Sequence, residues 1–231
     1  VAIEPSTGGI LALVSMPGYD PNLFVDGIGS QDWEALNTSE DKPMVNRALN
    51  GAYPPGSTFK PFMALAALEL GKRTPQQAIS DPGFFTFGGH TFRDDKPGGH
   101  GIVDMYKSIV HSCDTYYYVL ANDMGIDAIS NFMRQLGFGQ RTGIDIEGES
   151  EGVLPSQEWK KKRFRKPEQQ KWYAGETVSI GIGQGYNAYT PIQLAQATAA
   201  VASGGGIYRP HPVEHIENIN TGERTPIERQ P

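Results

Sequence analysis

The sequence contains a single cysteine, Cys113, and no apolar run close to the ~20 residues that a membrane-spanning helix requires. One cysteine excludes an internal disulfide framework, but it does not identify the compartment, because a large core can be stable without disulfides. An excess of positive charge is also lacking, since 20 Lys and Arg stand against 26 Asp and Glu, for a formal charge of −6. Nucleic-acid-binding domains carry a basic footprint, so no nucleic-acid partner is expected.

The composition is that of a folded protein. Hydrophobic residues make up 38% of the 231 residues and charged residues 20%, which argues against wholesale disorder. The length suffices for one large domain with a sizeable core or for two small domains. The chain begins at Val1 without a Met or a signal peptide. We therefore expect a piece of a longer protein, whose membrane anchor these residues cannot reveal.

Strands and loops are predicted mainly in the first half of the chain. Two apolar runs, 1–4 and 10–15, flank Pro-Ser-Thr-Gly-Gly and predict a β-hairpin. Residues 17–55 are rich in turn formers and predict a loop with a short helix near 33–36. Residues 74–101 are polar, glycine-rich and aperiodic, and they predict a further loop region.

Helical patterns recur in the second half, over 104–110, 115–124, 126–136 and 192–202. Asp114 or Thr115 is the expected N-cap of the second of these helices. The last helix has a complete set of boundary residues: a Thr190 cap, Pro191 in the first turn and a stop at Gly204.

Residues 53–71, YPPGSTFKPFMALAALELG, contain a proline just before a helical run. Proline is tolerated only in the first turn of a helix, and the apolar run 62–70 continues as a helix until a glycine ends it. The helix therefore begins about one turn before Pro61, at or near Ser57. This places the Ser57 hydroxyl at a helix N-terminus, with Lys60 one turn later on the same face.

Ser57 and Lys60 have the Ser-x-x-Lys spacing that acyl transfer uses. A serine hydroxyl is a weak nucleophile until a base takes its proton. The positive end of a helix disfavours an ammonium and favours an oxyanion, so this position suits Ser57 as nucleophile and Lys60 as base. The bare pattern also occurs by chance, and a capping serine beside a solvated lysine is the simpler explanation for an isolated match.

Longer segments give this pair a context. Residues 46–61, NRALNGAYPPGSTFKP, resemble the active-site segment of class B penicillin-binding proteins, the D,D-transpeptidases that cross-link peptidoglycan. Further similarities follow in the family's order: VAIEPSTGGILALVSMPGYDPN, SCDTYYY at the second motif, and GIGQGYNAYTPIQLA at the Gly-Gln-Gly segment. The stretch TGIDIEGESEGVLPSQEWKKKRFRKP resembles the elongation-specific branch, penicillin-binding protein 2.

This resemblance implies an α+β fold of the penicillin-binding protein and serine β-lactamase type. It has a central antiparallel sheet covered by helices, and a mainly helical subdomain. Residues 1–231 would form a single, incomplete transpeptidase domain without the C-terminal strands. Its expected parts are the hairpin, loop and nucleophile helix in 1–72, a helical subdomain with inserted loops in 73–180, and the Gly-Gln-Gly segment, a helix and the start of the C-terminal strands in 181–231.

The resemblance also assigns roles to residues. Ser57 would be acylated, Lys60 would be the base, and the Ser112 hydroxyl would relay a proton between Lys60 and the leaving amine. The Ser57 backbone N–H would supply half of an oxyanion hole. Substrate-binding contacts are expected from Asp114, Gly183, Gln184 and Gly185. The Gly-Gln-Gly segment fits a turn chosen for its backbone freedom equally well.

Two features depart from the family pattern. Asp114 stands where the second motif commonly ends in Asn, and a carboxylate near Lys60 would raise the lysine pKa and oppose its use as a base, unless Asp114 caps the next helix instead. In addition, neither Lys-Thr-Gly nor Lys-Ser-Gly, the third motif, occurs in the 231 residues. In the family this motif follows the 190–204 helix. We therefore expect the chain by itself to lack the second oxyanion donor and to acylate poorly or not at all.

Four residues between and beside the first two motifs are of types that zinc accepts: Asp81, Asp94, His100 and Cys113. Together they could fill a tetrahedral structural site that holds the loop and Ser112 in place, whereas catalysis needs no cofactor. Their spacing is no recognised signature, and a buried thiol with solvated aspartates and a loop histidine is the alternative.

Several remaining features have a structural interpretation beside a functional one. The basic run 159–167 is either a solvated face or a contact with anionic lipid head groups, the glycan strand or a partner protein. The tyrosines 116–118 favour core packing over a carbohydrate platform. His90 and His111 are further candidate ligands, but they fit surface positions better.

The function implied by the resemblance is that of a serine-type D-Ala-D-Ala transpeptidase/carboxypeptidase in cell elongation. Its substrates would be peptidoglycan stem peptides, and β-lactams would acylate the same serine. Implied partners are a polytopic glycan polymerase and an elongation scaffold, and the expected location is the periplasm, with an inner-membrane anchor N-terminal to Val1. A serine β-lactamase is an alternative, although no Glu stands in a recognisable deacylation loop, and a non-catalytic β-lactam sensor or structural domain is another.

Overall fold

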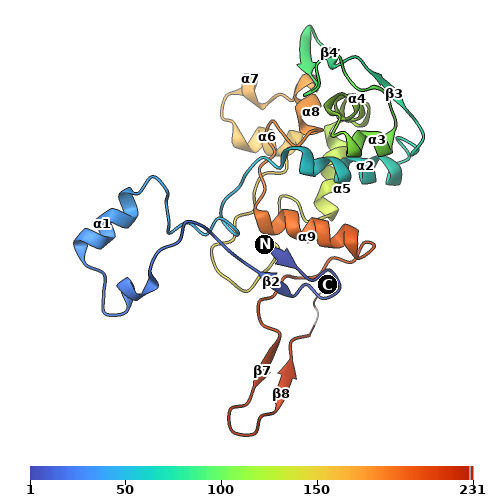
Figure 1. Ribbon diagram of the computed structural model, residues 1–231. Helices are drawn as coiled ribbons and strands as arrows, with labels where there is room; N and C mark the ends of the chain where they lie inside the picture. The colour runs from blue at the N-terminus through green and yellow to red at the C-terminus, as the bar shows by residue number, and fades with distance from the viewer. Residues whose placement is uncertain (229, 231) are drawn as a thin grey trace. The chain divides into compact units, whose positions relative to one another are not determined.

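The computed structural model describes residues 1–228 and 230 (Figure 1). Two compact units form, each from separate stretches of chain. The first unit consists of Val1–Ala52, Gln140–Gly152 and Thr190–Pro231, and the second of Tyr53–Gly139 and Val153–Tyr189. Residues 229 and 231, at the end of the predicted 181–231 segment, lie outside the described residues.

The first unit begins with the predicted hairpin. Strands β1 (Ala2–Ile3) and β2 (Ile10–Ala12) pair antiparallel, within shorter bounds than expected. Gly8 provides the left-handed turn residue with φ +83°, and a Cβ there would lie 2.6 Å from the Arg209 carbonyl oxygen. Glycine is therefore required at this position both for its conformation and for the close approach of the backbone.

The other elements of the first unit are short, apart from two helices. A 3-10 helix, η1 (Pro21–Phe24), precedes α1 (Ser30–Thr38), which is longer than the predicted helix near 33–36. Helix α9 (Pro191–Ala202) begins as predicted, with Thr190 and Gln193 forming a capping box. Strands β7 (His215–Glu217) and β8 (Arg224–Pro226) form a second antiparallel pair.

The core of the first unit is aliphatic. Leu49, Ile144 and Ile192 are buried together, and Ile3 and Ile10 of the hairpin pack against them. Strand β1 of the hairpin contacts helix α9 beside this core. The apolar residues from which strands in 1–15 were predicted are therefore the ones that pack against the core around Ile192.

In the second unit, the predicted loop over 74–101 is wrong in part, because this region contains strands. Strand β3 (Ile79–Asp81) pairs with β6 (Gly101–Val103), and β4 (Phe84–Phe87) pairs with β5 (His90–Arg93), both antiparallel. The turn between β4 and β5 is Gly88-Gly89, and both glycines have positive φ, as tight hairpins require. Strands of three or four residues are too short to display a period.

The first four α-helices of the second unit follow the sequence pattern closely. After the 3-10 helix η2 (Gly56–Phe59) come α2 (Lys60–Glu69), α3 (Met105–Val110), α4 (Asp114–Met124) and α5 (Ile126–Gln135). Three further helices, which were not predicted from the sequence, complete the unit: α6 (Gln157–Arg163), α7 (Pro167–Gln170) and α8 (Ala174–Ile180). In the described part of the chain, no helix combines the length and the apolarity needed to cross a bilayer.

The core of the second unit is rich in aromatic rings. Phe59 stacks on Tyr189 with centroids 5.9 Å apart, and Phe138 packs against both rings. The tyrosines 116–118 are buried, as predicted for core packing. Because Phe59 lies between Ser57 and Lys60 in sequence, this packing fixes the backbone from which both side chains project.

Candidate active site

Ser57 and Lys60 lie at the junction of η2 and α2. The Lys60 backbone N–H donates to the Ser57 carbonyl oxygen, a 3-10 contact in which side chains three residues apart eclipse one another. Pro61 occupies the first turn of α2, and the helical segment begins at Gly56, as the position of Pro61 predicts. Ser57 is exposed whereas Lys60 is only 2% exposed. Ser57 is therefore accessible to a substrate from solvent, whereas the Lys60 ammonium is buried.

The Lys60 ammonium has three close acceptors. Its Nζ lies 2.6 Å from the Ser112 carbonyl oxygen, 3.0 Å from Ser112 Oγ and 2.5 Å from Asp114 Oδ1. The Tyr117 ring lies below it, with the centroid 5.7 Å from Nζ. Three acceptors match the three hydrogens of an ammonium. The predicted first and second motifs therefore meet directly at this lysine.

The prediction that Asp114 or Thr115 caps α4 is wrong. The N-cap is Cys113, whose extended backbone places Sγ 3.4 Å from the Tyr116 N–H that it accepts. Asp114 is already in the first turn of the helix, so its carboxylate does not reach the cap position and contacts Lys60 instead. The departure from Asn at this position thus puts an anionic partner on Lys60.

Ser112 has a left-handed backbone conformation, with φ +53°. Such a conformation is uncommon for residues other than glycine and is found where surrounding structure imposes it. Here Ser112 forms the single-residue corner between His111, the C-cap of α3, and Cys113, the N-cap of α4. The corner turns both the Ser112 carbonyl and its hydroxyl toward Lys60.

The Gly-Gln-Gly segment contacts the residue before Ser57. The Gly56 N–H donates to the Gly183 carbonyl oxygen at 3.1 Å, and a Cβ on Gly183 would lie 2.3 Å from the Gly56 oxygen. Gly183 also has φ +70°, so no other residue fits without a backbone shift. The Gln184 amide nitrogen is 3.5 Å from where a Gly56 Cβ would stand, and Gln184 and Gly185 are exposed beside this contact.

The four predicted metal ligands are brought together. One ligand atom from each of Asp81, Asp94, His100 and Cys113 lies within 4.8 Å of all the others. His100 Nδ1 is 2.8 Å from Asp81 Oδ2, and Cys113 Sγ is 3.4 Å from the same oxygen. The two other candidate ligands, His90 and His111, are exposed, as expected for surface positions.

The pKa values at this cluster depend on burial and on the two buried carboxylates, Asp81 and Asp94, that lie close together. Burial alone would raise the pKa of Asp81, but hydrogen bonds from Thr115, Gly83 and His100 outweigh it and lower that pKa to about 2. Burial, with the carboxylates of Asp94 and Asp81 close by, raises the pKa of the Cys113 thiol. A cation is what would reverse this effect and favour the thiolate.

The cluster also holds the corner that carries Ser112. Asp94 Oδ2 accepts the Thr115 backbone N–H at 2.8 Å, and the Cys113 sulfur accepts that of Tyr116. Two of the four candidate ligands therefore bind the N-terminus of α4. A change at the cluster would be transmitted to Ser112 through one peptide unit.

Sequence reasoning missed a second buried lysine, Lys160 of α6, which it placed within a basic run. Lys160 is 4% exposed and forms an ion pair with Glu176, unlike a residue of a solvated face. The dense basic sequence of residues 159–167 gives no indication that one of its lysines is buried. The aromatic residues that follow it in sequence, Trp172 and Tyr173, were the available indication, since their rings lie next to the ammonium.

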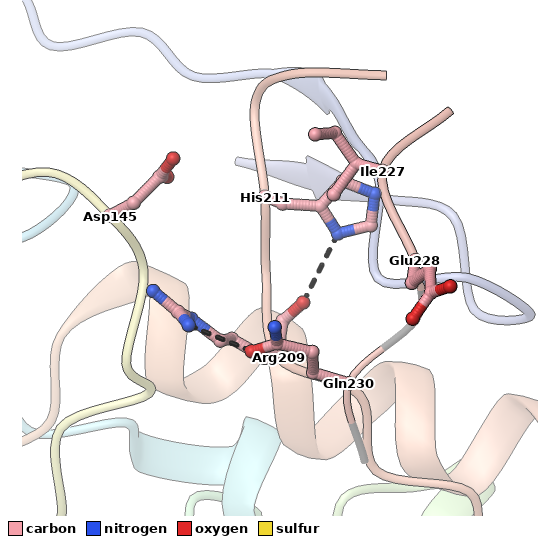
Figure 2. Close-up of a pocket in the computed structure, with 6 residues that line it drawn as sticks. All are labelled: Asp145, Arg209, His211, Ile227, Glu228 and Gln230. Carbon is pink, nitrogen blue, oxygen red and sulfur yellow. Dashed lines mark hydrogen bonds between the residues drawn. The ribbon is translucent and has the colours of Figure 1, made fainter. Parts of the chain in front are cut away.

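A cavity of about 180 Å³ in the first unit is mainly polar (Figure 2). His211 Nδ1 lies 3.2 Å from the Arg209 carbonyl oxygen, and the Arg209 guanidinium donates to Gln230 Oε1 at 2.8 Å. The remaining lining residues are Asp145, Ile227 and Glu228. Its groups bond mainly to one another, and none of the predicted site residues is among them.

Fold and site together define a Ser-x-x-Lys protein of mixed helix and sheet. The penicillin binding protein transpeptidase domain matches residues 1–231, and the chain belongs to this family. The peptidoglycan D,D-transpeptidase MrdA of Acinetobacter baumannii is 54% identical over 213 residues, which are 91% of this chain and 31% of that protein. The chain thus spans about a third of this curated relative.

Solved structures agree with this assignment. Penicillin-binding protein 2 of Pseudomonas aeruginosa, in complex with WCK 5153, is 48% identical with a TM-score of 0.84, over 90% of this chain and 47% of that one. The same protein of Helicobacter pylori, in complex with MreC, is 36% identical with a TM-score of 0.86, over 96% and 39%. These matches confirm the predicted fold class and the elongation-specific branch of the family.

Proposed function

We propose that the protein containing this chain is a peptidoglycan D,D-transpeptidase of cell elongation that works through an acyl-enzyme on Ser57. The observation that carries the proposal is the placement of Lys60 Nζ between Ser112 Oγ and Asp114 Oδ1, one turn after the exposed Ser57. A buried amine beside a second hydroxyl provides a path for the proton that the nucleophile must lose.

The proposed reaction has two acyl transfers. Ser57 Oγ attacks the carbonyl carbon between the two D-alanines of a stem peptide and forms a C–O bond, while its proton passes to Lys60, which acts as a neutral amine. The C–N bond then breaks, and the terminal D-alanine leaves as an amine that receives a proton through Ser112. An amine of a neighbouring stem peptide takes the acyl group from Ser57, or water takes it in a carboxypeptidase reaction.

The Ser57 backbone N–H would stabilise the oxyanion of each step. Gly183, Gln184 and Gly185 are the proposed substrate-binding residues, because the turn that they form lies against Gly56. Asp114 contributes through Lys60, whose ammonium it contacts. The 231 residues contain no Lys-Thr-Gly or Lys-Ser-Gly, so we expect them to acylate slowly when they are expressed alone.

The proposed partners and location follow from the family. The Helicobacter pylori relative solved with MreC supports an elongation scaffold as one partner, and a polytopic glycan polymerase is the second. The domain would lie in the periplasm, anchored in the inner membrane by a helix N-terminal to Val1. β-Lactams would compete with stem peptides for Ser57.

The test of this function is labelling of the full-length protein with a fluorescent penicillin. We expect one covalent adduct, located on Ser57 by peptide mass spectrometry and absent from Ser57→Ala. The protein should also release D-alanine from a pentapeptide donor and join the donor to an acceptor amine. An adduct that turns over within seconds would identify a β-lactamase instead, and growth and cross-linking that persist in Ser57→Ala cells would identify a sensor or structural domain.

We also propose that Asp81, Asp94, His100 and Cys113 hold a structural zinc ion. The ligand types suit zinc, and tetrahedral coordination separates ligand atoms by roughly 3.3–3.8 Å, which is compatible with four atoms that all lie within 4.8 Å of one another. The ion would stabilise the thiolate and fix the corner at Ser112.

Elemental analysis of protein purified without added metal tests the zinc site. We expect about one zinc per chain in the wild type and a large loss in Cys113→Ser. A chelator should lower the melting temperature of the wild type and leave that of Cys113→Ser almost unchanged. Absence of zinc from the wild type would refute the site without affecting the proposal for Ser57.

A further inference from the structure

Lys160 is held in one position by a complete set of acceptors. Its Nζ donates to the Lys171 carbonyl oxygen at 2.8 Å and to the two Glu176 carboxylate oxygens at 2.5 and 2.6 Å. The rings of Trp172, Tyr173 and Tyr186 lie around the ammonium, with centroids 5.7, 5.3 and 5.8 Å from Nζ. Aromatic faces at this distance attract a cation and exclude water from it.

Glu176 joins three parts of the second unit. Besides Lys160 of α6, it accepts the Tyr173 backbone N–H at the start of α8, at 2.8 Å. It also accepts the Tyr186 hydroxyl at 2.9 Å. One carboxylate therefore links α6, the first turn of α8 and a residue beyond the far end of α8. Without the ammonium, a half-buried carboxylate would be left without its counter-ion.

Tyr186 directly follows the Gly183–Gly185 turn. The turn is bonded to the end of α8, because Gly183 N–H donates to the Ile180 carbonyl at 3.0 Å and Gln184 N–H to that of Ser179 at 3.1 Å. The buried Asn187 amide adds bonds to the Ile180 and Gln184 carbonyls. Both ends of α8 are thus involved: Glu176 anchors one, and the turn leaves from the other.

The Gly183–Gly185 turn contacts the backbone just before Ser57, the proposed nucleophile. The Gly183 carbonyl accepts the N–H of Gly56, the residue before Ser57, with less than a methyl group's space between the two backbones. A path therefore runs from Lys160 through Glu176 to the Tyr186 hydroxyl by hydrogen bonds, along the main chain from Tyr186 to Gly183, and by a hydrogen bond from there to Gly56, the residue before Ser57. An oxyanion donor is effective only when its direction is fixed before the reaction begins.

We propose that Lys160 is a positioning residue for acyl transfer, which through Glu176 and Tyr186 holds the Gly183–Gly185 turn against Gly56 and so fixes the Ser57 N–H and hydroxyl. The inference rests on the proposed function of Ser57. It assigns Lys160 a role different from that of a solvated residue in the basic run 159–167. Lys162, on the same helix, has a 75% exposed side chain and pairs only with the exposed Glu158, and it shows what an ordinary member of that run looks like.

The test measures acylation of the full-length protein by a fluorescent penicillin at a series of concentrations. This separates the dissociation constant of the first complex from the first-order acylation constant, and the final amplitude counts active molecules. Lys160→Met should lower the first-order constant by about 10–100-fold, because small displacements of reacting groups have effects of this size. Lys162→Met, the matched control, should leave both constants unchanged.

Tyr186→Phe is the milder variant. It keeps the ring against Lys160 and removes only the hydroxyl bonded to Glu176, so we expect a fall of about 3–10-fold in the same constant, the equivalent of one hydrogen bond. If Lys160→Met does not fold, the first-order acylation constant of Tyr186→Phe tests the inference in its place. The inference is overturned if the folded variants lose melting temperature or active fraction while the first-order constant stays at the wild-type value. Failure of the wild type to label at Ser57 would instead refute the proposed function, and this inference with it.

Discussion

Lys60 and Lys160 are two buried lysines in the same unit with different surroundings. Lys60 donates to a carbonyl, a carboxylate and the Ser112 hydroxyl, whereas Lys160 donates to a carbonyl and both oxygens of one carboxylate. A hydroxyl can accept a proton and pass on its own, but a carbonyl has no hydrogen to pass on. This difference agrees with the roles proposed above, proton exchange for Lys60 and fixed geometry for Lys160.

The surroundings of the two ammonium groups agree with this difference. One ring, Tyr117, lies next to Lys60, and three rings surround Lys160. Lys60 lies at the start of a helix beside the exposed Ser57, where a substrate can reach it. Burial of a lysine is therefore not sufficient evidence for a role in proton transfer. The identity of its acceptors distinguishes the two cases.

The largest expected effect comes from Lys60→Met in the full-length protein. If Lys60 exchanges the proton of Ser57, the first-order acylation constant should fall by roughly 10²–10⁴-fold, the usual contribution of a general base. The effect should exceed that of Lys160→Met in the same assay. A smaller loss in Lys60→Met than in Lys160→Met would contradict the distinction between the two lysines.

Sequence reasoning located Ser57 and Lys60 because a proline constrains the start of a helix to within one turn. It brought Ser112 to the site only through the family resemblance, since 52 residues separate it from Lys60 and no local pattern encodes that contact. Helices such as α9 were predicted to within a residue because the cap, the first-turn proline and the glycine stop all lie in the local sequence.

The errors have physical causes as well. Asp114 was assigned to a cap because Asp is a common capping residue, but the extended backbone falls one residue earlier, at Cys113. Strands β3 and β6 were missed because their pairing is set by contacts between residues far apart in a glycine-rich segment, and β4 and β5, although joined locally by Gly88-Gly89, are too short to display a period. Lys160 was hidden among lysines that look the same in sequence, because burial depends on the ring of Tyr186 and on Glu176, which lie elsewhere in the chain.

Gly183→Ala tests the connection between the two lysines. Alanine at φ +70° is strained by roughly 1–3 kcal/mol, and its Cβ would also meet the Gly56 oxygen, so both melting temperature and acylation should fall. Gly71→Ala is the matched control: it has a similar strain at φ +62°, but no atom lies within 4 Å of its Cβ position, and Gly71 is not among the proposed site residues. Equal acylation by the two variants would show that the contact with Gly56 does not position Ser57.

The pH dependence of stability should report on the Lys160 pair. Burial would raise the pKa of Glu176, but hydrogen bonds from Lys160, Tyr173 and Tyr186 outweigh it and lower that pKa below its ordinary value. A lowered carboxyl pKa stabilises the fold above the unfolded-state pKa of about 4.3, and the stabilisation is lost as the pH falls below it. The difference in melting temperature between the wild type and Glu176→Gln should therefore stay constant from pH 7 to about pH 5 and narrow as the pH falls from there to about pH 2, through the lowered Glu176 pKa. A constant difference would contradict the ion pair.

The smallest expected effect is that of Lys162→Met on stability. Lys162 and Glu158 pair across one turn of α6 with both side chains about three-quarters exposed, and water and salt screen such a pair almost completely. The melting temperature of Lys162→Met should stay within experimental error of the wild type at both low and high salt. Lys160→Met removes the same charge two positions earlier, but it should lower the melting temperature. Both variants change the same helix and remove the same charge. A similar loss of melting temperature in both would therefore mean that the charge of α6 determines the stability of this region, and that the burial of the Lys160 ammonium among fixed acceptors does not.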